Sequence, residues 1–333
     1  MVPPIIALEE HFFSSAVPAA LQQSYSEQLK HVPGVLNKLQ DLSSLRRSDM
    51  DAGRVSLQII SHAPGLSDPE ACRGANDQLA AAIKAEEERA GGTAKVGKSR
   101  FAGFAVAPMG HPEEAARELR RCMTELGFVG ALVDNHCDGT FFEGAEYDAF
   151  WAAAEELDAP IYLHPNWPSD EMARHYAGSF SPAAALSMGS SALGWHAETA
   201  LHVLRLFASG LFDRRPKLKI ILGHMGETIP YFLQRIDVLS RRWGQFKRSF
   251  RVVYDENIWI TTSGVWSLDP LRCILSNTKL DHILYSVDYP FQKNGIGLEW
   301  MAELEESGLV NKEQLDAIAY GNAEKLLRVK APM

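Results

Sequence analysis

Eight short apolar runs alternate along the chain with segments whose apolar residues recur at helical spacing. The runs are residues 4–11, 55–62, 101–108, 128–135, 160–165, 218–224, 257–263 and 282–290. Most of them are apolar throughout, which is typical of parallel strands that helices cover on both faces. Residues 112–127 and 145–158 are amphipathic and predict two of the intervening helices. Eight β/α repeats predict an α/β protein with a (β/α)8 TIM barrel fold.

Two of the connections are longer than the others. Residues 14–53 form an insertion after the first predicted strand, and residues 166–193 form another after the fifth. Long connections in a compact fold tend to be lids or binding loops. Because no linker and no repeat beyond the β/α unit interrupts the pattern, we expect residues 1–333 to form a single domain.

Composition narrows the class of protein. Apolar residues make up 46% of the chain and charged residues 23%, which is ordinary for a folded globular protein. A net charge of −9 gives no electrostatic basis for binding nucleic acid or an anionic membrane. No apolar run reaches the ~18 residues of a membrane span, and the first residues lack the features of a signal peptide. The four cysteines are far apart and predict neither a disulfide framework nor a thiolate zinc site, so we expect a cytoplasmic protein.

The first predicted strand ends in an unusual group of charges. Residues 7–12 read ALEEHF, so Glu9 and His11 share one face of the strand while Glu10 occupies the other. Three adjacent ionisable groups are costly to bury unless they are paired or bound to a metal. A Glu-x-His pattern alone is a weak sign of a metal site.

Other predicted strands also end in side chains that bind metals. His164 ends the fifth run, His224 the sixth, and Asp288 lies near the end of the eighth. In a barrel, the C-terminal ends of the strands converge on one pocket. We therefore predict that one divalent ion is bound by Glu9, His11, His164 and Asp288. Two imidazoles and two carboxylates suit Zn²⁺ or Mn²⁺.

His224 is left for a different role. Glu227 follows three residues later, in GHMGE, where its carboxylate can hold one ring nitrogen and leave the other for a substrate. Taken singly, His224 also fits a core histidine bonded to a carbonyl, and Asp288 also fits a turn residue. The joint pattern across several strand ends favours the metal site.

The remaining histidines receive separate predictions. His62 ends the second run and is a candidate for lining the pocket. His202 lies inside a helical stretch and is predicted to be structural. His31, His111 and His282 lie in polar stretches and are predicted to be solvated.

Longer motifs carry a family resemblance over nearly the whole chain. They include ALEEHF, ELGFVGALV, IYLHP, ETALHVLRLFASGLFDRRPKLKIILGHMGE, ITTSG and YSVDYPF. The sequence resembles the metal-dependent decarboxylase branch of the amidohydrolase superfamily, which is aminocarboxymuconate semialdehyde decarboxylase-like. Within it, the γ-resorcylate and 2,3-dihydroxybenzoate decarboxylases are most similar.

The resemblance implies roles for individual residues. It places the metal ligands on Glu9, His11, His164 and Asp288, and the catalytic histidine with its supporting glutamate on His224 and Glu227. For substrate binding it implies Arg235, which would reach a neighbouring subunit's pocket, and the aromatic Trp195 and Phe291. His62 and Asn135 are further candidates for substrate binding, because they lie where ring substituents would be recognised. His62 and residues 133–136 depart from the resorcylate-type pattern, so the resemblance leaves the ring substituents open.

The implied activity is non-oxidative decarboxylation of an ortho-hydroxybenzoate-type aromatic acid, of the dihydroxybenzoate, salicylate or orsellinate class. It would release CO2 and a phenol reversibly, with one divalent ion, no organic cofactor and a homodimeric or homotetrameric assembly. The ring carbon that bears the carboxylate must be protonated before the C–C bond breaks. Asp288 is the candidate donor and His224 the candidate partner of the phenolic oxygen, although their roles could be exchanged.

Two other classes of function are compatible with this fold. A hydrolase or hydratase of the same superfamily would use a similar ion. Such hydrolases usually carry His-x-His on the first strand and often a bridging lysine, whereas this chain has Glu-x-His and no predicted strand that ends in lysine. A non-catalytic binding protein is the other class, and an intact ligand set with a His–Glu pair argues against it.

Overall fold

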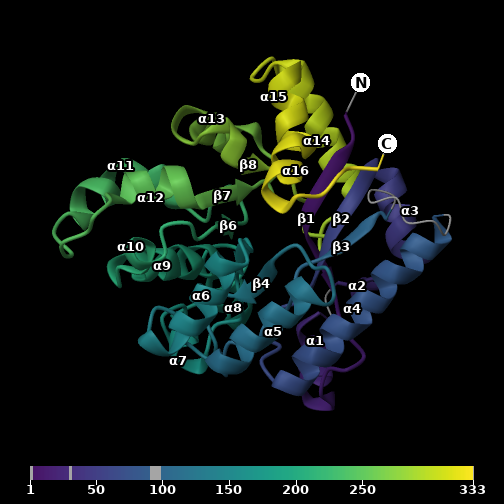
Figure 1. The fold of residues 1–333 in the computed structure, drawn as a ribbon, viewed down its shortest axis with the longest axis horizontal. Coiled ribbons are helices and arrows are strands. Elements are labelled where there is room, and N and C mark those ends of the chain that lie inside the picture. The colour runs from purple at the N-terminus through teal and green to yellow at the C-terminus, as the bar shows by residue number, and fades with distance from the viewer. Residues whose placement is uncertain (1–2, 30–31, 91–98, 333) are drawn as a thin grey trace.

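The computed structural model describes residues 3–29, 32–90 and 99–332. Parallel strands lie at the centre of this part of the chain (Figure 1), and the structure assigns eight of them. The strands are β1 (Ile5–Phe12), β2 (Val55–His62), β3 (Phe101–Gly103), β4 (Ala131–Asp134), β5 (Ile161–His164), β6 (Ile220–Leu222), β7 (Ile258–Thr261) and β8 (Ile283–Leu284). Each of β2 to β8 lies within one of the apolar runs of the sequence, and β1 extends one residue past its run, to Phe12. The prediction of eight strands is confirmed.

The strands close into a barrel. They pair in parallel as β1-β2-β3 and as β4-β5-β6-β7-β8. An isolated bridge between Ala105 and Ala131 joins the first group to the second, and one between Glu10 and Tyr289 closes the other side. The backbone N–H of His11 donates to the carbonyl of Tyr289 at 2.7 Å across this closing seam. The (β/α)8 architecture is therefore confirmed.

Helices surround the strands (Figure 1). The α-helices are α1 (Ala19–Gln28), α2 (Val35–Gln40), α3 (Ser44–Ala52), α4 (Pro69–Arg89), α5 (Pro112–Thr124), α6 (Asp148–Glu156), α7 (Asp170–Arg174), α8 (Pro182–Gly189), α9 (Gly194–Ala208), α10 (Leu211–Arg214), α11 (Ile229–Ser240), α12 (Phe250–Asn257), α13 (Leu268–Asn277), α14 (Asn294–Ser307), α15 (Lys312–Asp316) and α16 (Asn322–Leu327). Short 3-10 or π turns are η1 (Ala145–Tyr147), η2 (Leu280–His282) and η3 (Ala317–Gly321). Among the described residues, no helix has the length and apolar character needed to cross a bilayer.

Local sequence explains where these helices begin. Asp68 caps α4 by accepting a hydrogen bond from the N–H of Ala71, and Pro69 takes the first helical position. Helix α5 likewise begins with Pro112 and carries two glutamates in its first turn, where they complement the helix dipole. The helix predicted over 112–127 ends at Thr124, and that predicted over 145–158 comprises η1 and α6.

Both faces of the barrel wall are buried, which explains why the strands are apolar throughout. Inside the barrel, alternate strand residues form one cluster: Ile6, Leu8, Leu57, Ile59, Phe104, Leu132, Tyr162, Ile221 and Leu284. Three residues of α16, Ala323, Leu326 and Leu327, pack against the same cluster. The intervening strand residues pack outward against the helices in the larger core. At roughly 25 cal/mol per Å² of buried apolar surface, this two-sided burial dominates the stability of the barrel.

The two predicted insertions contain helices. Residues 14–53 contain α1, α2 and α3, and residues 166–193 contain α7 and α8. Helix α3 packs against α14, which follows the last strand, and Asp49 accepts hydrogen bonds from the backbone and side-chain nitrogens of Asn294 at 2.9 and 2.8 Å. The first insertion is thereby attached to the segment after β8.

Gly53 makes this attachment possible because a Cβ at that position would lie 2.6 Å from the backbone carbonyl carbon of Asn294. We expect Gly53→Ala to lower the free energy of unfolding by about 1–3 kcal/mol through overpacking. The matched control is Gly295→Ala in α14, where an added Cβ would meet nothing within 4 Å. Urea unfolding of both variants measures the difference, and equal stabilities would contradict the proposed close contact.

Candidate metal and proton-transfer site

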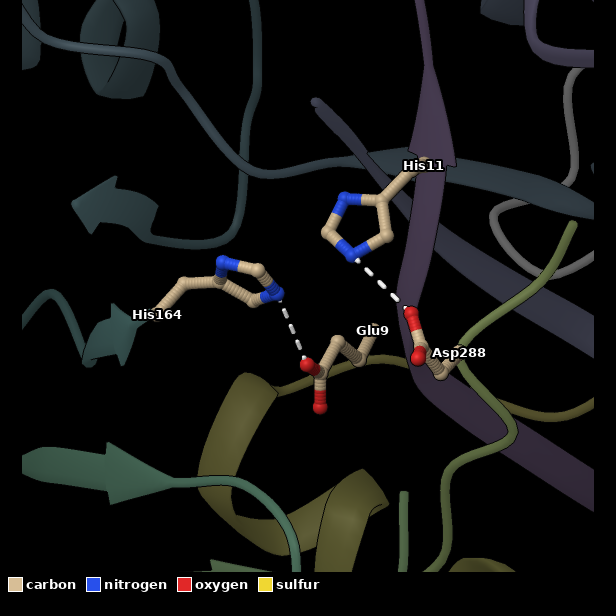
Figure 2. A group of neighbouring side chains, drawn as sticks. All are labelled: Glu9, His11, His164 and Asp288. Carbon is tan, nitrogen blue, oxygen red and sulfur yellow. Dashed lines mark ion pairs between the residues drawn. The ribbon is translucent and has the colours of Figure 1, made fainter. Parts of the chain in front are cut away.

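Four predicted metal ligands converge at the C-terminal mouth of the barrel. Glu9 and His11 come from β1, His164 ends β5, and Asp288 follows β8. Their donor atoms all lie within 4.8 Å of one another. Figure 2 shows the four side chains pointing toward a common centre, with His164 Nε2 3.0 Å from Glu9 Oε1 and His11 Nε2 3.4 Å from Asp288 Oδ1.

The hydrogen bonds around this group leave lone pairs facing one another. His164 Nδ1 donates to the carbonyl of Pro165 at 2.7 Å, so Nε2 of a neutral ring presents a lone pair to the Glu9 carboxylate. Within the described part of the chain, Glu9 Oε1 and His11 Nε2 are buried without a hydrogen-bond partner. Burying a carboxylate oxygen or a ring nitrogen without a hydrogen-bond partner costs free energy unless a cation lies between them. The residues therefore fit a single divalent cation with mixed nitrogen and oxygen ligands.

A bulge in β1 turns Glu9 toward the centre. The register with β2 is irregular between Ala7 and Glu10, and the N–H groups of Leu8 and Glu9 both donate to Ser286 Oγ, at 3.2 and 2.6 Å. Such a bulge lets Leu8 and Glu9 both face the interior, which strict alternation would prevent. Glu9 and His11 then share a face as predicted.

The other glutamate of the ALEEHF segment holds the backbone that follows β8. Glu10 is fully buried and accepts hydrogen bonds from the backbone N–H groups of Val287 and Tyr289, at 3.1 and 3.3 Å. These two donors flank Asp288, whose φ of 76° lies in the left-handed region. Burial raises the pKa of Glu10 well above its usual range. Glu10 therefore positions Asp288 beside the β1 ligands.

Tyr162 supports Glu9 from beneath the site, a contact that the sequence did not indicate. Its buried hydroxyl donates to Glu9 Oε2 and also lies 2.9 Å from Thr261 Oγ1. Burial opposes ionisation of Glu9, but the imidazoles of His224, His164 and His11 outweigh it and lower the pKa of this carboxyl. Glu9 is thus held as an oriented anion.

We expect Tyr162→Phe to weaken binding of a divalent ion about 10–100-fold, because partners that orient a ligand typically contribute that much. Chelator competition against Mn²⁺ and Zn²⁺ measures the affinity. Tyr254→Phe is the control, since its buried hydroxyl bonds Thr278 away from the cluster. Equal affinities in the two variants would show that Tyr162 does not orient Glu9.

His224 and Glu227 lie on a left-handed turn after β6. Five consecutive residues, 224–228, have φ between 49° and 85°, and only Gly226 adopts this region without steric cost. The turn is tied to β7 by the N–H of Met225, which donates to the carbonyl of Thr261 at 2.8 Å. Backbone strain of this kind often marks a functional segment.

The turn places His224 against Glu227 as the sequence predicted. His224 Nδ1 donates to Glu227 Oε1 at 2.7 Å, and His224 Nε2 lies 3.7 Å from Glu9 Oε1. Burial opposes protonation of His224, but Glu227 and Glu9 outweigh it and raise its pKa to about 10. Glu227 is fully buried and also contacts His196, a residue that sequence reasoning missed.

Comparisons with known proteins agree with this arrangement. The Amidohydrolase family profile matches residues 46–329. The chain belongs to the amidohydrolase family. The decarboxylase orsB of Emericella nidulans is 52% identical over 99% of this chain and 98% of its own length, and the gamma-resorcylate decarboxylase of Polaromonas sp. is 36% identical over 97% and 98%. A crystal structure of a dihydroxybenzoic acid decarboxylase from Polaromonas sp. with bound manganese and the inhibitor 2-nitroresorcinol is 34% identical, with a TM-score of 0.83 over 98% of this chain and 97% of that one.

In this amidohydrolase, only some of the residues predicted to bind substrate lie against the candidate metal ligands. The Phe291 ring lies 5.8 Å from that of His11, and the Trp195 ring lies 5.1 Å from that of Trp167 with a buried, unpartnered Nε1 within the described residues. Asn135 instead bonds Thr199 and the backbone of Asn166. Arg235 is exposed on α11.

A cavity of about 310 Å³ lies next to the strand of His164 and is lined by His62, Leu66, Val106, Asp134, His136 and Phe142 among others. The four clustered ligands are not among its lining residues, but Asp134 is the register partner of His164 on the adjacent strand. His62 lines the cavity with both ring nitrogens occupied: Nε2 accepts from the N–H of Ser14, and Nδ1 donates to the carbonyl of Ala63.

The other histidines give mixed outcomes. His202 is buried and accepts a hydrogen bond from the N–H of Phe142, in agreement with a structural role. His111 is exposed at the start of α5, as predicted. The prediction that His282 is solvated is wrong: it is buried, stacks on Trp259 at 4.2 Å and donates to the carbonyl of Ile258. His31 lies outside the described residues. The four cysteines are free.

Burial lowers the pKa of His62 to about 4 and that of His202 to about 3. Between these values and about 6.5, the unfolded chain binds more protons than the folded one, so stability falls as the pH falls. We expect a loss of about 1.4 kcal/mol per pH unit for each such histidine. His202→Gln, whose Oε1 can replace Nε2 as acceptor, should reduce the slope of unfolding free energy against pH. An unchanged slope would contradict this assignment.

Proposed function

We propose that this chain is a metal-dependent carboxy-lyase that removes the carboxylate of an ortho-hydroxybenzoate-type aromatic acid as CO2. The observation that carries the proposal is the convergence of Glu9, His11, His164 and Asp288 on one centre, with the His224–Glu227 pair beside it. The similarity to decarboxylases over nearly the full length of the chain supports it.

We propose Mn²⁺ as the native ion and Zn²⁺ as a competent substitute. Manganese in the structure from Polaromonas sp. supports this choice. A divalent ion, when bound, would supply positive charge. The substrate's carboxylate and ortho oxygen could chelate the ion, and this chelation would hold the ring in place. Glu9, His11, His164 and Asp288 would hold it. No organic cofactor is required for the chemistry below.

The chain's own residues must then move one proton. The ring carbon that bears the carboxylate gains a proton, the bond from that carbon to the carboxylate breaks, and its electron pair restores the aromatic ring as CO2 leaves. Asp288 is our candidate donor because its carboxyl adjoins the centre. His224, oriented by Glu227 through Nδ1, presents Nε2 toward the same centre and would bond the phenolic oxygen. A positioned acid typically contributes ~10²–10⁴ in rate.

We place the ring substituents on the side of the 310 Å³ cavity. Its wall combines apolar side chains with Asp134, whose Oδ2 already accepts from the N–H of Gly65. Asp134 lies one strand spacing, about 4.8 Å, from the strand of His164. A substituted ring anchored at the metal ligands would therefore be within reach of this wall. Phe291 and Trp195 would contact the ring from other sides.

We further propose a single domain that assembles as a homodimer or homotetramer and works in the cytoplasm. The exposure of Arg235, together with Tyr231 and Phe232 at 57% and 56% on the same helix, supports a subunit contact through α11. Free cysteines support a reducing compartment.

The test is CO2 release from a panel of acids by protein stripped with a chelator and reconstituted with Mn²⁺ or Zn²⁺. Salicylate, 2,3- and 2,6-dihydroxybenzoate and orsellinate form the panel, and ultraviolet absorbance follows the loss of each. We expect turnover of at least one acid that depends on the added ion. Metal-loaded protein that releases no CO2 from any of them, or that instead hydrolyses lactones, would contradict the proposal.

Two substitutions should separate metal binding from turnover. We expect His224→Ala to retain the ion but lose at least ~10²-fold in kcat, since it removes a positioned proton-transfer group. His164→Ala should lose both the ion and turnover, because it removes a ligand. Elemental analysis beside the CO2 assay measures both quantities, with His111→Ala on the exposed start of α5 as the control. Near-native kcat in His224→Ala would remove that residue from the mechanism.

A further inference from the structure

Glu227 lies between two imidazoles rather than one. Its carboxylate is fully buried, with Oε1 2.7 Å from His224 Nδ1 and Oε2 2.6 Å from His196 Nδ1. His224 comes from the strained turn after β6, whereas His196 comes from the first turn of α9. The two rings lie 4.7 Å apart at 62°. The carboxylate therefore has a separate partner for each oxygen.

His196 is itself held on its other side. Its Nε2 lies 3.1 Å from the carbonyl oxygen of Ser191, which can only accept a hydrogen bond. The imidazole thus spans from the end of the 166–193 insertion to the buried Glu227. Its side chain is 19% exposed, whereas that of Glu227 is 0% exposed, so His196 covers the carboxylate from the solvent side.

The three side chains have the composition of a metal site, and their donor atoms lie within 4.8 Å of one another. Hydrogen bonds nevertheless account for every one of these contacts. Each imidazole Nδ1 faces a different oxygen of the same carboxylate at ordinary hydrogen-bond distance. A carboxylate held by two N–H donors needs no cation, so this trio is better explained as a hydrogen-bonded chain than as a second metal site.

The consequence of losing His196 follows from burial. Without it, Oε2 of Glu227 would be a buried carboxylate oxygen with no donor, which costs more than an ordinary hydrogen bond. The carboxyl would then rotate or take up a proton to satisfy itself. In the intact site, the hydrogen bond from His224 Nδ1 to Glu227 orients the ring so that His224 Nε2 lies 3.7 Å from Glu9 Oε1. Either change in Glu227 would disturb that hydrogen bond. The orientation of His224 therefore depends on His196, although the two residues share no hydrogen bond.

We propose that His196 is a positioning residue for turnover: its Nδ1–H fixes Glu227, and Glu227 in turn fixes the orientation of the His224 ring. The inference rests on the proposed function, in which His224 acts on the substrate. It adds a residue of α9 to a site otherwise built from strand ends. The dependence is on hydrogen-bond geometry, so substitutions that keep or remove one donor can test it.

The test compares His196→Asn with His196→Ala in protein loaded with Mn²⁺, on an acid that the unmodified chain decarboxylates. Asparagine places its amide N–H close to the position of Nδ1, whereas alanine offers no donor. We expect kcat to fall about 10–100-fold in His196→Ala, with KM changed less than about threefold and one ion per chain retained. His196→Asn should recover most of kcat.

Several results would overturn the inference. They are full kcat in His196→Ala, an asparagine variant no better than alanine, a change confined to KM, or two ions bound per unmodified chain, which would make the trio a metal site. A second measurement does not depend on activity. In protein loaded with diamagnetic Zn²⁺, the Nδ1–H proton of His224, bonded to a carboxylate, should give a downfield proton NMR signal that His224→Gln removes.

This signal should shift or broaden in His196→Ala and persist in His196→Asn. A signal that is the same in all three proteins would overturn the positioning role even if no acid on the panel were decarboxylated, so the two proposals fail separately. Thermal unfolding of each variant identifies any general loss of structure. His202→Gln, on the same helix but bonded to Phe142, is the control for α9 itself.

Discussion

The seam between β1 and β8 is the constraint on which the candidate site depends. Glu10 accepts hydrogen bonds from Val287 and Tyr289, and His11 donates to Tyr289 at the same seam. These bonds fix the backbone on both sides of Asp288. They bring that carboxylate to within reach of Glu9 and His11, which lie on the first strand. Glu10, the carboxyl of ALEEHF that faces away from the centre, therefore holds the two sides of the centre together.

Near this seam, buried carboxylates are stabilised by neighbouring imidazoles rather than by solvent. Glu9 is surrounded by three imidazoles and a phenol, and its pKa is lowered although burial alone would raise it. Glu227 is stabilised in the same way by His224 and His196. At effective dielectric constants near 20, unit charges at such distances interact by several kcal/mol. A buried carboxylate between nitrogen donors is a repeated device of this molecule.

The sequence predicted the strands well because two-sided burial demands uninterrupted apolar runs, and it predicted Glu9, His11, His164 and Asp288 as neighbours because parallel strand ends must meet. It did not predict the contact of Tyr162 with Glu9, since a tyrosine within an apolar strand is ordinarily interpreted as a core residue. His196 was missed because it starts a helix and lies at no strand end. His282 was wrongly predicted to be solvated, because its polar neighbours hide the stacking on Trp259. Left-handed backbone at non-glycine residues, as in 224–228, has no reliable sequence signal.

The long span between the two halves of the seam also bears on how the protein is made. Glu10 and Val287 are 277 positions apart, so one side of the seam leaves the ribosome well before the other. At roughly 5–20 residues per second, the interval is on the order of 15–55 s. During that time the nascent chain contains Glu9 and His11 but lacks Asp288. An ion that needs all four clustered side chains would therefore bind only after residue 288 has been synthesised.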